Sequence, residues 1–315
     1  MAENTSRRAF LAGLAAAGGM IAGRAVSAPA AGCCSTAMDP CLAVFISDLH
    51  INGLKDEIPT HQYEEACFRN TVAAILALDP LPANVVCFGD IAYHWGQRED
   101  YVLAARLMKP LADAGIRLTL GLGNHDRRDS FLEVWPEYAK TSPVPGRIVS
   151  KLELPHVDLL MLDTLNALEV EKFKKSRPGE MDGAQREWLA ETLKASTKPV
   201  LTCAHHKPGE DKVALAGLLM KSGSCRGYIH GHWHKWARDF FYAGWNPQHV
   251  KPYVGLPSTG HWGDIGYATM RTFPDRVEIT NHQCDFFFTG GPGDAQPMRA
   301  DVVRELDGQK VTLRI

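Results

Sequence analysis

The chain has 315 residues, of which 45% are hydrophobic and 22% are charged, a composition typical of a globular protein with a large core. Its 34 Lys and Arg residues nearly balance its 36 Asp and Glu residues, which leaves a formal net charge of −2. This balance gives no electrostatic reason to expect a nucleic-acid or anionic-membrane partner, and it argues against a nuclease with a basic groove.

Residues 1–30 have the pattern of a secretion signal. The pair Arg7-Arg8 precedes an apolar run rich in alanine and glycine that is too short for a membrane span. Small residues follow, and Ala28-Pro29-Ala30 resembles a signal-peptidase site. The arginine pair resembles the twin-arginine type of signal. We therefore expect a signal peptide over residues 1–30, a short tail over residues 31–40, and export to the periplasm or the cell exterior through the export machinery.

Two other interpretations of this end stay open. Residues 1–30 could form an uncleaved hydrophobic anchor or a disordered tail. Alternatively, Ala30-Ala31-Gly32-Cys33 has the form of a lipoprotein cleavage box, with alanine at the position where such boxes usually carry leucine. In that case a lipid on Cys33 would anchor the protein to a membrane. We expect no transmembrane span in the mature chain.

The eight cysteines include no Cys-x-x-Cys pair, so a zinc-ribbon type of site is unsupported. Export would permit disulfides, although their pairing cannot be deduced from the spacing. Cys87 and Cys203 lie inside apolar runs of strand length, and we expect both to be buried as small hydrophobic side chains.

The first half of the chain alternates apolar runs of strand length with segments of helical period. Strands are predicted at residues 42–46, 85–88 and 116–120, and helices at residues 63–78 and 99–114. This βαβαβ order is typical of an open sheet with helices on its faces.

The second half continues the alternation and then changes its period. Strands are predicted at residues 148–154, 159–162, 200–203 and 227–229, and helices at residues 183–193 and 212–220. Residues 267–272 and 277–280 have period two and predict a meander. No linker-like stretch divides residues 41–315, so we expect one α/β domain in which two sheets pack face to face with helices outside.

Metal-competent side chains follow five of the predicted strands. The segments are Asp48-Leu49-His50, Gly89-Asp90, Gly123-Asn124-His125-Asp126, His205-His206 and His230-Gly231-His232-Trp233-His234. Carboxylate, imidazole and amide donors without thiolates suit Mn, Fe or Zn. Two ions need about seven or eight ligand bonds with one carboxylate shared, and the chain supplies that number.

An extended segment has a period of two, which predicts which side chains face the same way. Asp48 and His50 should share one direction, and so should His232 and His234. By the same alternation, His206 and His230 should point elsewhere and serve in packing or in contacts behind the metal ligands.

In this order, and from residue 48 to residue 234, the motifs resemble the signature of the calcineurin-like metallophosphoesterases. The resemblance implies a four-layer α/β/β/α sandwich of two mixed sheets with a dinuclear metal site at the sheet edge. It also implies a hydrolase of phosphate esters that acts on a small phosphorylated substrate with a metal-bridging hydroxide.

The resemblance divides the site residues between two metals. Asp48, His50 and His234 would hold one ion, whereas Asn124, His205 and His232 would hold the other, and Asp90 would bridge both. His125 would stay off the metals and face the substrate. Asp126 would orient His125, which is the weakest part of this assignment.

Tyr93 leaves one alternative open. Gly89-Asp90-Ile91-Ala92-Tyr93 resembles the purple acid phosphatase branch, in which a tyrosine binds ferric iron. That branch has glycine where this chain has His50. Since His50 offers a competing ligand, we favour Tyr93 as part of the pocket wall.

The substrate is only partly constrained by the sequence. Asn-His-Asp together with Asp-x-His resembles the cyclic-nucleotide phosphodiesterase group, whereas Tyr93 favours an acid phosphatase. Substrate choice should lie in the loops at residues 52–61, 92–98, 127–147 and 240–261, with an aromatic pocket rim at residues 256–262. A non-catalytic exported binding protein on the same fold is a further alternative, but such a protein would be expected to have lost ligands.

Overall fold

The computed structural model describes residues 37–54, 63–93, 95–166, 179–209, 213, 215–242, 250–260, 262–287 and 304–315. They belong to one compact unit, residues 36–315. The predicted signal peptide and Cys33 lie outside the described residues. The first strand begins at Met38, inside the segment predicted as a short tail.

The first sheet has six strands in the order β12-β11-β10-β1-β2-β3. Strands β1 (Met38–Ile46), β2 (Leu81–Cys87) and β3 (Arg117–Leu120) pair in parallel. Strands β10 (Gly263–Thr272), β11 (Arg276–Phe287) and β12 (Lys310–Arg314) continue the sheet with antiparallel pairing. The sheet is therefore mixed, and its parallel half corresponds to the predicted βαβαβ segment.

The second sheet also has six strands, in the order β4-β5-β6-β7-β9-β8. Strands β5 (Asp158–Met161), β6 (Val200–Ala204), β7 (Cys225–His230) and β9 (Val250–Gly255) are parallel. Strands β4 (Ser150–Glu153) and β8 (Ala237–Tyr242) close the two edges by antiparallel pairing.

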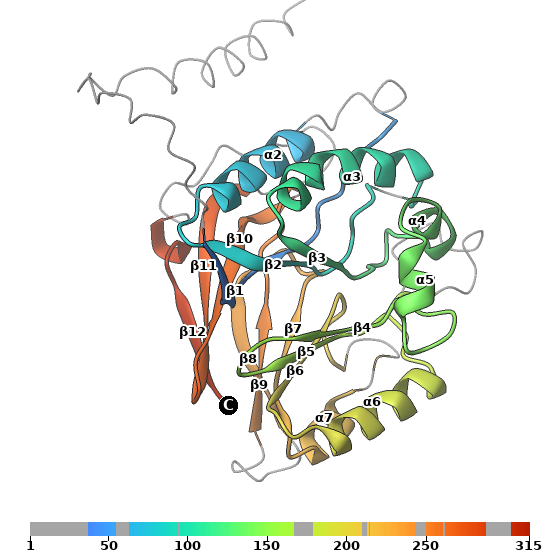
Figure 1. Cartoon of the computed structure of the whole chain (residues 1–315), viewed down its shortest axis with the longest axis vertical. Helices are drawn as coiled ribbons and strands as arrows, with labels where there is room; N and C mark the ends of the chain where they lie inside the picture. The colour runs from blue at the N-terminus through green and yellow to red at the C-terminus, as the bar shows by residue number, and fades with distance from the viewer. Residues whose placement is uncertain are drawn as a thin grey trace, which may run out of the picture. The chain divides into compact units, whose positions relative to one another are not determined.

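Helices cover the outer face of each sheet, which gives four layers (Figure 1). Helices α2 (Tyr63–Leu76) and α3 (Arg98–Asp113) lie over the first sheet, and α6 (Gly183–Ala195) and α7 (Ala216–Lys221) lie over the second. The predicted fold class is confirmed. Two short helices, α4 (Arg128–Val134) and α5 (Glu137–Thr141), occupy part of the segment that was expected to be a loop.

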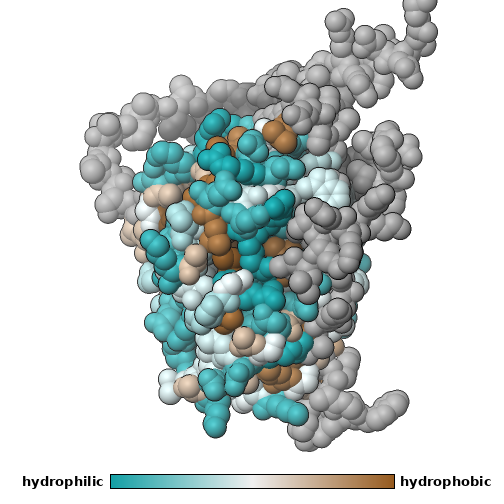
Figure 2. Space-filling model, turned by 90° about the vertical axis from the view of Figure 1, so that its right-hand side faces the viewer, coloured by the Kyte–Doolittle hydropathy of each residue, from teal (hydrophilic) through white to brown (hydrophobic). Residues whose placement is uncertain are grey.

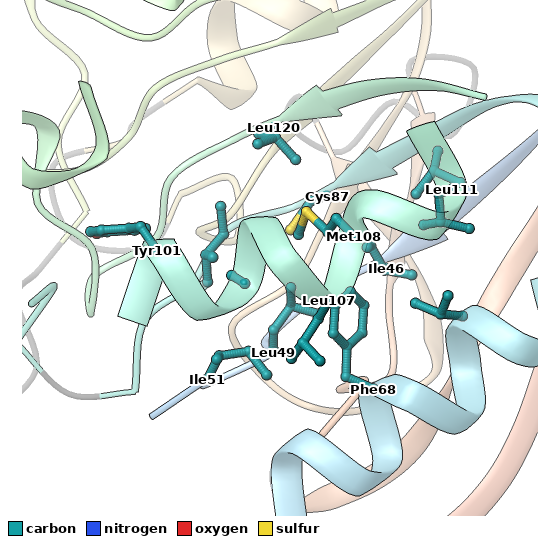
Figure 3. Packing of buried hydrophobic residues seen from close by; sticks show 14 of the residues in the cluster. Ile46, Leu49, Ile51, Phe68, Cys87, Tyr101, Leu107, Met108, Leu111 and Leu120 are labelled. Carbon is teal, nitrogen blue, oxygen red and sulfur yellow. The ribbon is translucent and has the colours of Figure 1, made fainter. Parts of the chain in front are cut away.

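Three separate hydrophobic cores fill the three interfaces between these layers. In β1, Val44 and Ile46 face the helices, whereas Ala43 and Phe45 face the second sheet, as the period of a strand requires. Figure 3 shows the first core, where Leu107, Met108 and Leu111 of α3 pack beside Ile46, Cys87 and Phe68. Because both faces of the central strands are buried, their sequences are continuous apolar runs.

The predicted burial of Cys87 and Cys203 is confirmed, since neither is exposed to solvent. Burial also raises the pKa of both thiols. The described residues contain no disulfide. Within the same part of the chain, no helix is long and apolar enough to cross a membrane.

The surface carries few large hydrophobic side chains. On the face shown in Figure 2, hydrophilic residues and small hydrophobic patches are interspersed. Among the described residues, Trp233 and Trp262 are the exposed large hydrophobic side chains, at 47% and 44%.

Candidate metal centre

The five predicted segments converge at one edge of the molecule. Strands β1, β2 and β3 are parallel, and so are β6 and β7, so the carboxyl ends within each sheet lie at the same edge. Each of these ends carries candidate ligands, namely Asp48, His50, Asp90, Asn124, His205, His232 and His234. Several sets of three His and Asp side chains there are close enough to hold a metal ion.

Asp48, His50 and His234 form the first set. His234 Nε2 lies 3.1 Å from Asp48 Oδ1 and 3.4 Å from His50 Nε2. All three side chains are buried. The ligand atoms thus meet at one point, as the resemblance implied for the first metal.

The second set centres on His205. Its Nε2 lies 3.0 Å from Asn124 Oδ1 and 3.2 Å from His232 Nδ1. Asp90 Oδ2 joins this set at 3.2 Å from His205 Nε2, and it also lies 3.7 Å from His50 Nε2. Asp90 is therefore the carboxylate that both sets have in common.

Backbone carbonyls fix which ring nitrogens carry protons. Phe88 O lies 3.0 Å from His205 Nδ1, Tyr93 O lies 3.2 Å from His50 Nδ1, and Trp262 O lies 2.7 Å from His234 Nδ1. Since a carbonyl oxygen only accepts, each Nδ1 must donate, which leaves a lone pair on each Nε2 of a neutral ring.

These lone pairs point at one another and at oxygens, so the donor set fits metal ions. The Nε2 atoms of His50 and His234 face each other, and Nε2 of His205 faces oxygens of Asn124 and Asp90. Such contacts between acceptors are repulsive unless a metal ion or a proton lies between them. His50, His205 and His234 also have the outer hydrogen bond that metal-bound imidazoles typically have.

The pKa values of the site residues also indicate a place for a cation. Burial would raise the pKa of Asp48 and Asp90, but His234 and His205 hold both pKa values below the usual range. Burial would likewise lower the pKa of His205, yet Asp90 raises it to about 9. In the absence of metal, protons therefore occupy positions that a cation would take.

The backbone at the ligands differs from the sequence prediction. Asp48, His50, Asp90, His232 and His234 have φ between 47° and 68°, and they are the non-glycine residues with positive φ in the described part of the chain. These ligands thus have left-handed backbone rather than the extended backbone that the alternation argument assumed, although Asp48 and His50 do reach one ligand set as expected. Left-handed backbone disfavours residues with a Cβ by roughly 1–2 kcal/mol each, and such strain is concentrated at functional sites.

Two glycines let the ligand segments approach closely. A Cβ on Gly123 would lie 2.2 Å from Asp90 Oδ1 and 2.6 Å from Asp90 N. A Cβ on Gly231 would lie 2.0 Å from Ser47 Oγ and 2.8 Å from Asp48 Oδ2. Both glycines are therefore needed for the close contact between segments.

His125 and Asp126 are adjacent in sequence but have different contacts. His125 N donates to Asp90 Oδ1 (2.8 Å), and His125 Nδ1 lies 3.0 Å from Tyr93 O. Asp126 is buried and accepts hydrogen bonds from the amides of Gly123 (2.8 Å) and Ala92 (3.0 Å). These contacts show that Asp126 braces the ligand loops, and its expected role in orienting His125 stays a prediction.

Tyr101 completes the support of Asp126. Its hydroxyl donates to Asp126 Oδ1 (3.1 Å) and accepts from Arg127 N (2.7 Å). Burial and the nearby charge of Asp90 raise the pKa of Asp126 to about 7. The sequence offered no signal for Tyr101, because its role depends on α3 packing under the loop.

The predicted direction of His206 was wrong. The ring of His206 lies 4.9 Å from that of His232, and ligand atoms of His205, His206 and His232 lie within 4.8 Å of one another. His206 Nδ1 lies 2.9 Å from Thr164 Oγ1, which anchors the ring beside the second set. His230 is buried and lies against Tyr253, with ring centroids 5.8 Å apart.

Tyr93 contributes its backbone to the site. Its carbonyl oxygen faces Nδ1 of both His50 and His125. The phenol is half-buried, and burial together with the charge of Glu64 raises its pKa to about 12. Tyr93 thus meets His50 and His125 through its carbonyl oxygen.

Comparison with known proteins gives a family match. The model of the family described as calcineurin-like phosphoesterase matches residues 43–236, which is more than half of the chain. A "Probable cyclic nucleotide phosphodiesterase" of Psychrobacter arcticus is 27% identical over 51% of this chain and 57% of that relative. A second protein with this description, from Rhodopseudomonas palustris, is 26% identical over 70% of this chain and 83% of its own length. The chain therefore spans less than two thirds of the first relative.

A similar fold occurs among solved structures. A dimetal phosphatase from Danio rerio superposes with a TM-score of 0.60 and 17% sequence identity, over 77% of this chain and 96% of the phosphatase. At this identity the likeness concerns the fold. It agrees with the two mixed sheets flanked by helices that are described above.

Proposed function

The chain belongs to the calcineurin-like phosphoesterase family, and we propose that it hydrolyses phosphate esters at the edge where β1, β2, β3, β6 and β7 end. The observation that carries the proposal is the position of Asp90, within 3.2 Å of His205 Nε2 and 3.7 Å of His50 Nε2. One carboxylate common to two ligand sets is what a two-metal site requires.

The residues present fit two ions with mixed nitrogen and oxygen ligands. Asp48, His50 and His234 hold one, and Asn124, His205 and His232 hold the other, with Asp90 shared. When bound, the ions supply the positive charge that polarises a phosphate ester and acidifies water near neutral pH. Mn, Fe and Zn all suit this donor set.

His125 has the role of a proton donor to the leaving group. Its Nδ1 is held by Tyr93 O and its amide by Asp90, so the ring is fixed beside the site. The second ring nitrogen can carry the proton that a leaving alkoxide needs. The structure thus supports a division in which Asn124 binds metal and its neighbour His125 serves the substrate.

We propose a phosphodiester as the substrate, with cyclic nucleotides as the first candidates because both relatives described above carry that description. The test is a panel of p-nitrophenyl phosphate, its bis-ester and cyclic nucleotides, run with Mn, Fe and Zn. Faster turnover of the diesters is expected. Preferential hydrolysis of p-nitrophenyl phosphate would favour a phosphomonoesterase instead.

A non-catalytic binding protein is the alternative from another class. It predicts a purified protein that holds well under one metal ion per chain after reconstitution at neutral pH. The complete ligand sets argue against it, because a protein that no longer needs metals has no reason to keep five strained ligand residues.

We also propose export, on the pattern of residues 1–30. The test is cell fractionation of a bacterium that expresses the full chain, with sequencing of the mature N-terminus. Replacing Arg7 and Arg8 by lysine should retain the protein inside the cell. A lipid on Cys33 would appear as added mass on the mature N-terminus and would be lost in Cys33→Ser.

A further inference from the structure

Trp262 is exposed and lies directly against the first ligand set. It is one of the two exposed large hydrophobic side chains in the described part of the chain, with 44% of its surface accessible. Its ring centroid lies 4.5 Å from that of His234, at an interplanar angle of 33°. The indole therefore packs against the imidazole of a candidate metal ligand.

The backbone around Trp262 is fixed to the ligand loop. Trp262 O accepts from His234 Nδ1 at 2.7 Å, and Asp264 N donates to His234 O at 2.9 Å. Gly263 has φ +94°, and a Cβ there would lie 2.3 Å from His234 O. The backbone of Trp262 is thus held against the ligand loop, and its indole packs on the His234 ring, so binding to it requires little ordering of the protein backbone.

Trp233 is the other exposed indole, and its surroundings differ. The ammonium group of Lys207 lies 4.5 Å from the centroid of the Trp233 ring and 5.0 Å from that of Tyr253. A cation already lies over this ring, so Trp233 is the poorer surface for a neutral planar group. Trp262 is favoured because its ring lies 4.5 Å from that of the candidate ligand His234.

We propose that Trp262 is a specificity-determining residue that stacks on the nucleobase of a phosphodiester whose phosphate lies at the metal centre. The inference rests on the proposed function, and it names the substrate class as nucleotides. Phosphoesters without a flat aromatic group would gain nothing from the indole. Base stacking on an aromatic side chain is worth roughly 5- to 150-fold in affinity.

A matched pair of substrates tests the proposal. Adenosine 3′,5′-cyclic phosphate is compared with methyl riboside 3′,5′-cyclic phosphate, which has a methoxy group in place of the base. Trp262→Leu should lower kcat/KM for the nucleotide by roughly 5- to 150-fold and leave the methyl riboside nearly unchanged. Trp262→Phe should retain most of the preference, because it keeps an aromatic ring.

Binding supplies a readout that needs no metal. In metal-free protein, the indole N–H resonance of Trp262 is assigned by its loss in Trp262→Phe. Adenosine 5′-monophosphate should shift this resonance, whereas ribose 5-phosphate should not. If the nucleotide shifts the indole resonance but the protein hydrolyses no phosphoester, the proposed function is rejected and the contact between Trp262 and the base is supported.

Three outcomes overturn the inference. One is an equal loss of kcat/KM on both substrates in Trp262→Leu, and another is no loss on either. The third is a preference for the nucleotide over the methyl riboside that disappears in Trp233→Leu but persists in Trp262→Leu. If the bis-p-nitrophenyl ester is hydrolysed while the indole resonance stays unmoved by nucleotide, the proposed function stands and the base contact is rejected.

Discussion

Nε2 of His50 lies 3.4 Å from Nε2 of His234, while Nδ1 of each ring donates to a backbone carbonyl. Two imidazole lone pairs held this close repel each other unless a metal ion or a proton lies between them. The arrangement is maintained by Tyr93 O, which follows β2, and by Trp262 O, which precedes β10 of the same sheet. The site is therefore built for metal, and its stability should depend on metal.

Removal of the metal ions should destabilise the protein. Binding at about 1,000 times Kd adds ~4 kcal/mol to the free energy of unfolding, which corresponds to roughly 10 °C in Tm for a chain of this size. Thermal unfolding with and without a chelator checks this. The same treatment of Asp90→Asn, which lacks the shared carboxylate, should give a much smaller shift; an equal shift would contradict the shared role of Asp90.

Asp90 and His125 should separate metal binding from catalysis. Asp90→Asn should lose bound metal and activity together, because both ligand sets include Asp90. His125→Ala should lower turnover by ~10²–10⁴-fold with the metal content unchanged. Metal analysis beside kinetics measures both, with Asp113→Asn at an exposed position of α3 as the control. Loss of bound metal in His125→Ala would contradict this assignment and would make His125 part of the metal site.

Much of the fold could be predicted because the central strands are buried on both faces. Continuous apolar runs such as residues 42–46 marked β1, and the helical period marked α2 and α3. Strand β8, with the sequence Ala-Arg-Asp-Phe-Phe-Tyr, has no alternation to mark it. Strand β12 does alternate between exposed and buried residues, and this period of two is the pattern that predicts a strand.

The candidate ligands could be predicted as a set, but their geometry could not. Residue types at strand ends indicate which side chains meet, since parallel strands end at one edge. The positive φ of Asp48 and His232, and the bracing of Asp126 by Tyr101, depend on contacts between segments far apart in the chain. Local periodicity contains no information on such contacts.

Tyr93→Phe should leave the metal site intact, because the part of Tyr93 that faces His50 and His125 is its carbonyl oxygen. We expect unchanged metal content and an activity within a few-fold of the unmodified protein. An iron-loaded sample should show no visible tyrosinate charge-transfer band. The appearance of such a band, and its loss in Tyr93→Phe, would establish the purple acid phosphatase alternative.

Gly123→Ala should damage the metal site through a steric clash. The added methyl would lie 2.2 Å from Asp90 Oδ1 and 2.6 Å from Asp90 N, so Asp90 must move. We expect weaker metal binding and a loss of ~1–3 kcal/mol in the free energy of unfolding. Gly217→Ala in α7 is the matched control, since its Cβ would meet nothing within 4 Å, and it should be neutral or stabilising by about 0.5–1 kcal/mol.

His282 should make stability depend on pH at a position away from the metal centre. Burial lowers the pKa of His282 despite the opposing charge of Asp307, and the ring lies 2.8 Å from Thr269 Oγ1 and stacks on Tyr267. Because the unfolded chain takes up the proton at a higher pH than the folded chain, this contribution is present above about pH 6.5 and decreases as the pH falls. Urea unfolding at pH 5 and 7.5 should therefore show a smaller pH difference in His282→Gln. An unchanged difference would mean that the ring is protonated equally in both states.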